Sequence, residues 1–466
     1  MAETTLSGIS VREQRQQVGL SQAKLSELTG VPQHVLSAFE LGKSELPASI
    51  EAIVVSALAR SADVSALSGR RKRYLTHTYS EVPIVPGRVA RTGKTEQNAS
   101  YVVRLNELAA AHASGQNSGL NALSLFSGCG GFSLGFSAAG FALKGYVEIE
   151  EDLRRIYRAN FRNSAEIGGD ISLISDAEIR QHATAFGAVD AIIGGPPCQG
   201  FSLAGKRDVG DPRNNLFRHY LRFVDEMRPK VAFLENVRLL TSMKGADGSP
   251  VKDQITDEFH RHGYKVAFFE VDAMDYGIPQ HRERVIFVAT RADLDIAPSI
   301  PMATHGTACD LFSDLLPHMT FADACSDLAY VESGGGSADP LHSAVRHPDH
   351  VVRWLWDVPE GRSAHDNEDP TLRPPSGYNT TYKRQVWLEP ASTVQTTFGM
   401  ISGCRNVHPV ATRSLTVREA ARVQSFPDQF QFPGVLGPIR TGIGNAVPPL
   451  LAFALAKHAK ALIQSL

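Results

Sequence analysis

Short apolar runs alternate with amphipathic stretches through the middle of the chain. Runs typical of strands occur at 122–126, 145–148, 188–193, 231–234, 264–271 and 282–288, and the clearest helical period between them spans 216–227. Strands that alternate with helices predict an α/β domain with a mostly parallel sheet. Ligands of such sheets bind outside the carboxyl ends of the strands, so the residues after each run are the first candidates for a site.

Residues 9 to about 60 follow an all-helical pattern. Ser21 is a suitable helix N-cap, and Gly30 should end the helix that follows it. The apolar face of that helix is predicted at Ala23, Leu25 and Leu28. Val31 and Pro32 should start a second helix, with the proline in its first turn. Helix, glycine-containing turn and helix together predict a helix-turn-helix fold.

The stretch from Val11 to Lys43 resembles the helix-turn-helix of phage-repressor-like regulators. The resemblance implies an internal ion pair between Arg15 and Glu40. It places three side chains toward the major groove of DNA, those of Gln33, His34 and Ser37. The alternative is a small helical domain that binds protein rather than DNA.

Two segments lose all regular periodicity. Residues 61–119 have the composition of a linker, although 98–112 could add a helix; the basic run at 70–73 either faces solvent or touches phosphate. Residues 293–412 combine glycine and proline clusters with interleaved aromatic and basic side chains, which suits nucleic-acid contact. A purely structural insertion is the alternative for the second segment.

Composition narrows the class of protein. The 466 residues are 42% hydrophobic and 21% charged with a net charge of -2, so any nucleic-acid partner must be held by local basic patches. The 5 cysteines are scattered without a CxxC pair, which argues for a reducing compartment and against a metal site or a disulfide framework. The sequence has no signal peptide. It also has no apolar stretch as long as a membrane span, which needs roughly 20 residues. We therefore expect a cytoplasmic protein without membrane contact.

Candidate chemistry follows five of the predicted strands or strand-like units, the unit at 169–171 included. A glycine-rich turn begins at Ser127, and Glu148 lies about 20 residues beyond it, where a carboxylate can bind ribose hydroxyls. Asp170 and Glu235 follow later strands. Cys198 comes directly after a Gly-Gly-Pro-Pro turn; taken alone it could be a buried structural thiol. Because all these residues fall just beyond strand ends, we expect them in one cleft.

From about Leu120 onward the chain resembles the DNA cytosine-5 methyltransferase family. The resemblance rests on motifs in the family's order: 125–131, Glu148, 169–171, 195–199, 235–237, 280–284, 418–427 and 444–448. It implies that Cys198 attacks carbon 6 of cytosine as a thiolate, which turns carbon 5 into a nucleophile. A buried Glu235 would carry or share a proton at ring nitrogen 3.

The same resemblance assigns the remaining site residues. Arg284 would hold the base carbonyl oxygen, Arg282 would lie near a phosphate or the Cys198 loop, and Gln199 and Ser202 would contact DNA. The methyl donor would be S-adenosylmethionine. Its expected contacts are Phe126, Gly128, Gly130, Gly131, Glu148, Ile149, Asp170, Ile171, Pro196, Asn445 and Val447. The target carbon lies inside a duplex, so the base must be flipped into the cleft.

The resulting fold prediction is α/β, a Rossmann-like, mostly parallel methyltransferase sheet with an inserted irregular target-recognition domain and an N-terminal all-α helix-turn-helix domain. The expected boundaries are 1–70 for the helix-turn-helix, 71–119 for a linker, 120–292 for the catalytic domain, 293–435 for target recognition and 436–466 for a returning catalytic segment. We expect a double-stranded DNA partner, a monomer on the methylation target, and a dimer through the N-terminal domain if it binds an operator. Two alternatives stay open: a tRNA cytosine-5 methyltransferase, and a transcription regulator with an inactive methyltransferase domain.

Overall fold

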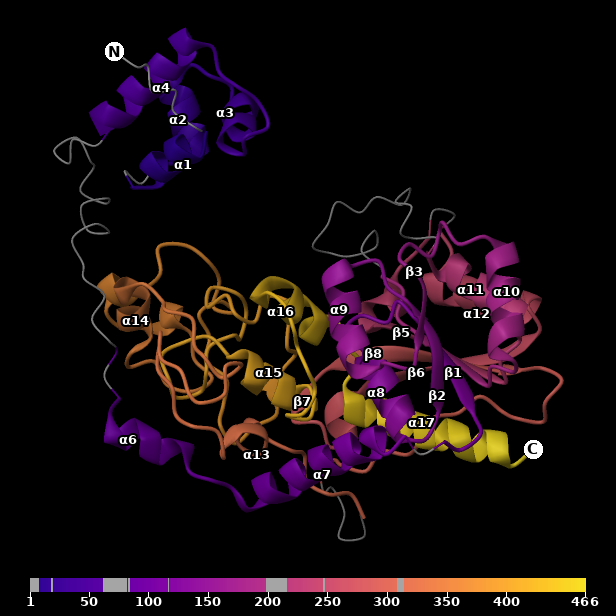
Figure 1. The fold of residues 1–466 in the computed structure, drawn as a ribbon. Coiled ribbons are helices and arrows are strands. Elements are labelled where there is room, and N and C mark those ends of the chain that lie inside the picture. Colours follow the sequence, from indigo (N-terminus) through magenta and orange to yellow (C-terminus); the bar gives the residue numbers. More distant parts are fainter. Residues whose placement is uncertain are drawn as a thin grey trace. The chain divides into compact units, whose positions relative to one another are not determined.

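A computed structural model describes residues 8–17, 20–61, 82, 84–115, 117–197, 216–245, 248–307 and 314–466. The chain divides into two compact units, Met1–Ser80 and Glu81–Leu466, whose elements are labelled in Figure 1. The basic run at 70–73 lies outside the described residues.

The N-terminal unit is helical, as predicted, and contains α1 (Gly8–Gln17), α2 (Gln22–Thr29), α3 (Gln33–Glu40) and α4 (Ala48–Ser61). The Ser21 hydroxyl caps α2 by accepting a hydrogen bond from the Lys24 amide, and Gly30 ends the helix with φ of 70°. The predicted apolar face of α2 is wrong at two positions, because Ala23 and Leu28 are exposed and only Leu25 is buried. Residues from α1, α3, α4 and the connecting loops fill the rest of this small core.

The predicted ion pair of the N-terminal unit is present. Arg15 Nε lies 2.6 Å from Glu40 Oε1, and a second guanidinium nitrogen donates to Oε2 at 2.8 Å. Burial would raise the pKa of Glu40, but hydrogen bonds from Arg15 and Gln22 hold it below its ordinary value. The pair therefore joins α1 to the end of α3.

The second unit is built on a seven-stranded sheet with the order β3-β2-β1-β4-β5-β8-β6. The neighbouring strands β3, β2, β1, β4 and β5 pair in parallel. By contrast, β8 pairs antiparallel with both β5 and β6. The strands are β1 (Asn121–Leu125), β2 (Ala142–Val147), β3 (Ala165–Gly168), β4 (Ala191–Gly194), β5 (Val231–Val237), β6 (Tyr264–Asp272) and β8 (Glu283–Arg291). The mostly parallel sheet predicted from the sequence is confirmed.

Helices cover both faces of this sheet (Figure 1). One core contains Ile193 and Phe233 with α8 (Gly131–Ala138), α9 (Glu151–Asn160) and α17 (Pro449–Gln464). The other contains Ile192 and Leu234 with α10 (Asp176–Phe186), α11 (Leu216–Met227) and α12 (Val251–Arg261). Neighbouring residues of one strand thus face opposite cores, as the pleat requires.

Much of the expected linker at 71–119 belongs to the second unit. α6 (Pro86–Val89) contacts the irregular region, where Arg88 lies over the Trp356 ring at 3.8 Å. α7 (Glu96–Ala113) packs on α8, and its buried Tyr101 donates to the Arg422 carbonyl at 2.6 Å. Linker-like composition between 84 and 95 misled the prediction, because these contacts join residues hundreds of positions apart.

The region predicted to read the target, 293–435, packs in two separate ways. A small core of its own spans 351–407 and includes Leu355 of α14 (Asp349–Leu355) and Val407. α13 (Phe321–Cys325) and α15 (Val417–Val423) instead pack in the main core of the sheet. β7 (Gln280–His281) and β9 (Ala391–Ser392) form a second sheet that connects the two regions.

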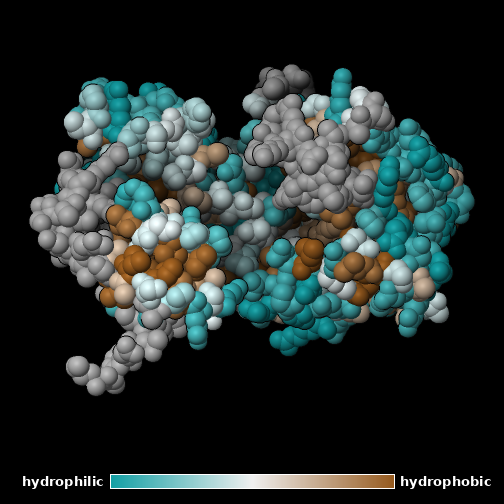
Figure 2. All heavy atoms as spheres, turned by 90° about the horizontal axis from the view of Figure 1, so that it is seen from above, coloured by the Kyte–Doolittle hydropathy of each residue, from teal (hydrophilic) through white to brown (hydrophobic). Residues whose placement is uncertain are grey.

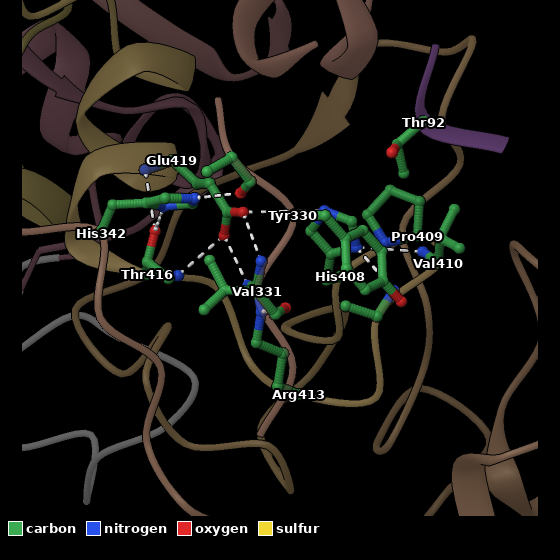
Figure 3. A network of polar contacts seen from close by, with 12 residues as sticks. Thr92, Tyr330, Val331, His342, His408, Pro409, Val410, Arg413, Thr416 and Glu419 are labelled. Carbon is green, nitrogen blue, oxygen red and sulfur yellow. Dashed lines mark hydrogen bonds and ion pairs between the residues drawn. The ribbon is translucent and has the colours of Figure 1, made fainter. Parts of the chain in front are cut away.

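A buried polar network holds the start of α15 (Figure 3). Arg413 donates to both oxygens of Glu419, at 2.8 and 2.7 Å, and to the Val331 carbonyl at 2.6 Å. Glu419 also accepts from the Thr416 amide at 2.9 Å, and His408 Nε2 lies 3.6 Å from it. This network joins the irregular region to α15, which packs in the main core of the sheet.

The surface shown in Figure 2 is largely hydrophilic with separate hydrophobic patches. Within the described ranges, no single helix is long and apolar enough to cross a membrane. α16 (Leu436–Asn445) and α17 meet that test only as a pair, with a 43° bend between them. The main core buries much of both helices, which accounts for their apolar composition.

Candidate active site

Several predicted catalytic and cofactor residues of the second unit lie at one edge of the sheet. β1, β2, β4 and β5 are parallel, so their carboxyl ends lie together. Phe126 follows β1, Glu148 follows β2, and Gly195 and Pro196 follow β4. Glu235 is an exception to the expected pattern, because it lies within β5 rather than beyond its end. The strand continues through Val237 since β8 supplies an antiparallel partner there.

Glu235 and Arg284 form an ion pair at this edge. Arg284 Nε lies 2.8 Å from Glu235 Oε1, and the two side chains are 14% and 10% exposed. Their register explains the contact, since Arg284 pairs with Val237, two residues from Glu235 on the same face of β5. The two groups predicted to contact the ring of cytosine therefore lie together in a nearly dry site.

The Glu235 carboxylate also lies against the loop that leads to Cys198. A Cβ at Gly195 would come 2.9 Å from Glu235 Oε2, so a larger residue there would displace the carboxylate. Asn236 donates from Nδ2 to the Pro196 carbonyl at 2.8 Å, and this bond braces the loop. Cys198, Gln199 and Ser202 lie outside the described residues, and their roles stay predictions.

Arg282 is placed differently from the prediction. It is 1% exposed, and its guanidinium donates to the carbonyls of Gly444 and Ala446 at 3.0 and 2.9 Å and of Val394 at 3.3 Å. Burial lowers its pKa, and the nearby Arg284 adds to that effect. We therefore remove Arg282 from the expected phosphate contact and from direct catalysis. It is a positioning residue that fixes the backbone on both sides of Asn445.

The expected cofactor end of the site is built around Glu148. Its Oε2 accepts from the Gly128 amide at 2.7 Å and its Oε1 from the Glu150 amide at 3.0 Å, which leaves each oxygen a lone pair for a hydroxyl donor. Burial raises the pKa of Glu148, although the two amide donors oppose the shift. Phe126 has φ of 52°, a conformation that non-glycine residues adopt rarely and often at functional sites.

The three glycines of the turn have different surroundings. A Cβ at Gly128 would meet nothing within 4 Å, so a ligand can approach that backbone. At Gly130 a Cβ would lie 2.4 Å from the Phe161 ring, and at Gly131 it would lie 2.4 Å from the Val447 carbonyl. Glycine at 130 and 131 therefore allows close packing of the chain, whereas the space beside Gly128 is open.

Four other residues that were expected to contact the cofactor have different surroundings. Ile149 is 61% exposed, whereas Ile171 is buried in the core of the sheet. Asp170 accepts at Oδ1 from the amide and hydroxyl of Ser172. Asn445 ends α16 with its side chain exposed, so it can reach a ligand.

Comparison with known proteins decides the family. Residues 120–461 match the C-5 cytosine-specific DNA methylase family, and residues 11–63 match a helix-turn-helix family. The chain belongs to the C-5 cytosine-specific DNA methylases. It is therefore a methyltransferase that acts on carbon 5 of cytosine in DNA, with S-adenosylmethionine as the general methyl donor of its family.

Relatives of this methylase include bacterial type II methyltransferases. The chain is 37% identical to Type II methyltransferase M1.HphI of Haemophilus parahaemolyticus, over 72% of this chain and 86% of that protein. It is 35% identical to Type II methyltransferase M.DdeI of Desulfomicrobium norvegicum, over 73% and 88%. Among solved structures, a prophage-encoded protein of E. coli described as a DNA modification methyltransferase is 26% identical with a TM-score of 0.58, covering 74% of this chain and 99% of that one.

The methylase also carries the predicted DNA-facing residues on α3. Gln33 and His34 are exposed and Ser37 is half-buried, so all three can reach a ligand on that face of the helix. Their contact with DNA stays a prediction.

Two buried glutamines of the methylase received no role from the sequence. Gln280 accepts from the Val394 amide at 2.8 Å and donates to Gln424 Oε1 at 2.9 Å, and Gln424 donates to the Ile443 carbonyl at 2.6 Å. This chain of hydrogen bonds joins β7, the end of α15 and α16. Their only sequence signal was position, because each glutamine lies within a motif of the resemblance.

Proposed function

We propose that this protein is the modification enzyme of a type II restriction-modification system and methylates cytosine within one specific duplex sequence. The observation that carries the proposed chemistry is the Glu235–Arg284 ion pair beside Gly195 and Pro196. This pair supports the proposal because it lies next to the loop that leads to Cys198, where an acid–base group and a cation would be needed. The type II relatives support the biological role.

In the proposed reaction, the Cys198 thiolate forms a bond to carbon 6 of a flipped cytosine. Glu235 transfers or shares a proton at ring nitrogen 3, while Arg284 keeps Glu235 in place and reaches the base carbonyl oxygen. S-adenosylmethionine would supply an electrophilic methyl group: its bond from sulfur to the methyl carbon would break as the bond to carbon 5 forms, and S-adenosylhomocysteine would leave. Loss of the carbon 5 proton to a base then breaks the bond between carbon 6 and sulfur and restores the thiolate.

The residues of the cofactor end fit the proposed donor. Glu148 retains acceptor capacity for ribose hydroxyls, and the backbone at Gly128 is open to a ligand. Phe126 is half-buried at the same loop and offers an aromatic face for the adenine ring. Arg282 holds the segment that presents Asn445.

Bisulfite sequencing of DNA from cells that express the protein tests this function. We expect cytosines protected at one short sequence and nowhere else, which also identifies the recognition site. Purified protein should methylate a duplex that contains this sequence and should not methylate tRNA. Methylation of tRNA with unmodified cellular DNA would favour the tRNA alternative.

We further propose that the N-terminal unit binds the promoter of its own operon and represses it. The match to a helix-turn-helix family and the exposed Gln33 and His34 support this role. Binding to a palindromic operator would pair two copies through this unit.

Deletion of residues 1–70 should abolish promoter binding in a mobility-shift assay and leave methylation of the target duplex within a few-fold of the intact protein. A full-length Gln33→Ala/His34→Ala variant should give the same loss, because it removes only the exposed polar groups of α3. Unchanged promoter binding by the truncated protein would exclude autoregulation by this unit.

A further inference from the structure

Arg440 of α16 has an unusual setting. Its guanidinium lies directly on the backbone of Gly399, where a Cβ would come 2.3 Å from Cζ and 2.5 Å from Nε. Glycine at 399 is therefore required for this position of the arginine. The contact fixes the side chain without giving it a hydrogen bond.

Arg440 lacks the partners that other buried arginines have. Arg282, Arg384, Arg413 and Arg422 each donate several hydrogen bonds to carbonyls or carboxylates. Arg440 itself is half-buried, and within the described ranges its Nε meets no acceptor. The Nε atoms of Arg282 and Arg384 also meet none, but the other guanidinium nitrogens of those two arginines are paired. Burial lowers the pKa of Arg440, and no carboxylate opposes that shift.

An unpaired cation that is partly removed from water costs free energy, so such groups are normally paired. His347 is near enough to be affected by the charge of Arg440, but burial lowers its pKa to about 4, so it is neutral at physiological pH. Within the described ranges no carboxylate pairs with Arg440, so its positive charge is available to an anionic ligand.

The helix that carries Arg440, α16, ends beside the active site. α16 ends at Asn445, and Arg282, two residues before Arg284, donates to the Gly444 and Ala446 carbonyls. A Cβ at Gly444 would lie 2.4 Å from the Thr396 amide nitrogen, so α16 touches the segment that leads to Gly399. Figure 1 shows α16 between the sheet and the irregular region, and Met400 beside Gly399 is 57% exposed.

We propose that Arg440 binds a backbone phosphate of the duplex that carries the target cytosine. A guanidinium can bind a phosphate through two parallel hydrogen bonds, and the exposed surface beside Gly399 gives such a polymer access. The phosphate supplies both the missing charge and the missing acceptors. The contact would fix the position of the duplex between the irregular region and the site without reading its sequence.

The test is the salt dependence of binding to the target duplex, measured by fluorescence anisotropy on the full chain with S-adenosylhomocysteine present. Arg440→Gln should weaken binding about tenfold at 0.1 M salt. In a plot of the logarithm of the binding constant against the logarithm of the salt concentration, it should also reduce the slope by about 0.9, the value for one lost phosphate contact. Arg180→Gln is the matched control, since Arg180 is exposed and already pairs with Glu226 at 2.6 Å; its slope should equal that of the intact protein.

Two further variants make the result unambiguous. Arg440→Lys keeps the charge, so its slope should stay near that of the intact protein while its affinity falls. Gly399→Ala displaces the guanidinium and should reduce the slope as Arg440→Gln does. An unchanged slope in Arg440→Gln, or an equal loss of slope in Arg440→Lys, would overturn the proposal. A loss of S-adenosylhomocysteine affinity with an unchanged slope would also overturn it and assign the arginine to the donor's carboxylate.

Discussion

Replacing Cys198 with alanine should abolish methyl transfer while the target duplex still binds. Without a thiolate, no bond forms at carbon 6, and carbon 5 stays too weak a nucleophile to take the methyl group. We expect the rate of methyl transfer to fall about 10⁴-fold or more, as when the nucleophile of another covalent mechanism is removed. Transfer of labelled methyl groups, together with duplex binding by anisotropy, measures both halves of this expectation.

A duplex with 5-fluorocytosine at the target position gives an independent readout. Fluorine cannot leave carbon 5 as a proton does, so the intact protein should form a stable covalent adduct and Cys198→Ala should form none. Cys404→Ala is the control, because Cys404 is an exposed thiol that does not belong to the predicted catalytic residues. This variant should retain both turnover and adduct formation. Appreciable methylation by Cys198→Ala, or an adduct with that variant, would contradict the nucleophile assignment.

Local pattern was sufficient to predict the sheet and the edge that carries the site. The apolar run at 231–234 marks the core of β5, and the Gly-Gly-Pro-Pro turn marks the end of β4, because both signals lie within a few residues. Since parallel strands end at one edge, strand position alone brings Glu148 and Glu235 to the same side. The Arg15–Glu40 pair came instead from resemblance to a known helix-turn-helix.

Features that depend on long-range contacts could not be predicted in this way. Arg282 looked like a site residue because it is a charged group two positions from Arg284, but its partners at Gly444 and Ala446 are more than 160 residues away. The same holds for α7, whose docking rests on the bond from Tyr101 to the Arg422 carbonyl. Local periodicity contains no information about which distant carbonyl a buried donor will find.

Glu419→Gln should be the most destabilising single change in the second unit. It leaves the Arg413 guanidinium, 1% exposed, without its charged partner, and an uncompensated buried charge costs about 3–5 kcal/mol in the free energy of unfolding. All 3 tryptophans, Trp354, Trp356 and Trp387, lie in this unit, so urea unfolding followed by tryptophan fluorescence reports on it directly. Glu226→Gln is the control, because its pair with Arg180 is exposed and should contribute less than about 1 kcal/mol.

The pH dependence separates this ion pair from an ordinary buried hydrogen bond. Burial opposes ionisation of Glu419, but the charge and hydrogen bonds of Arg413 outweigh it and hold the pKa of Glu419 far below its usual range. A carboxyl with a lowered folded-state pKa stabilises the protein above its unfolded-state pKa and loses that contribution only as pH falls through the folded-state value. The stability difference between the intact protein and Glu419→Gln should therefore persist from pH 7 to pH 5. If the difference vanished over that range, the pair would not be ionised in the folded protein. A double variant, Arg413→Leu/Glu419→Leu, should recover part of the lost stability, because it removes both buried charges together.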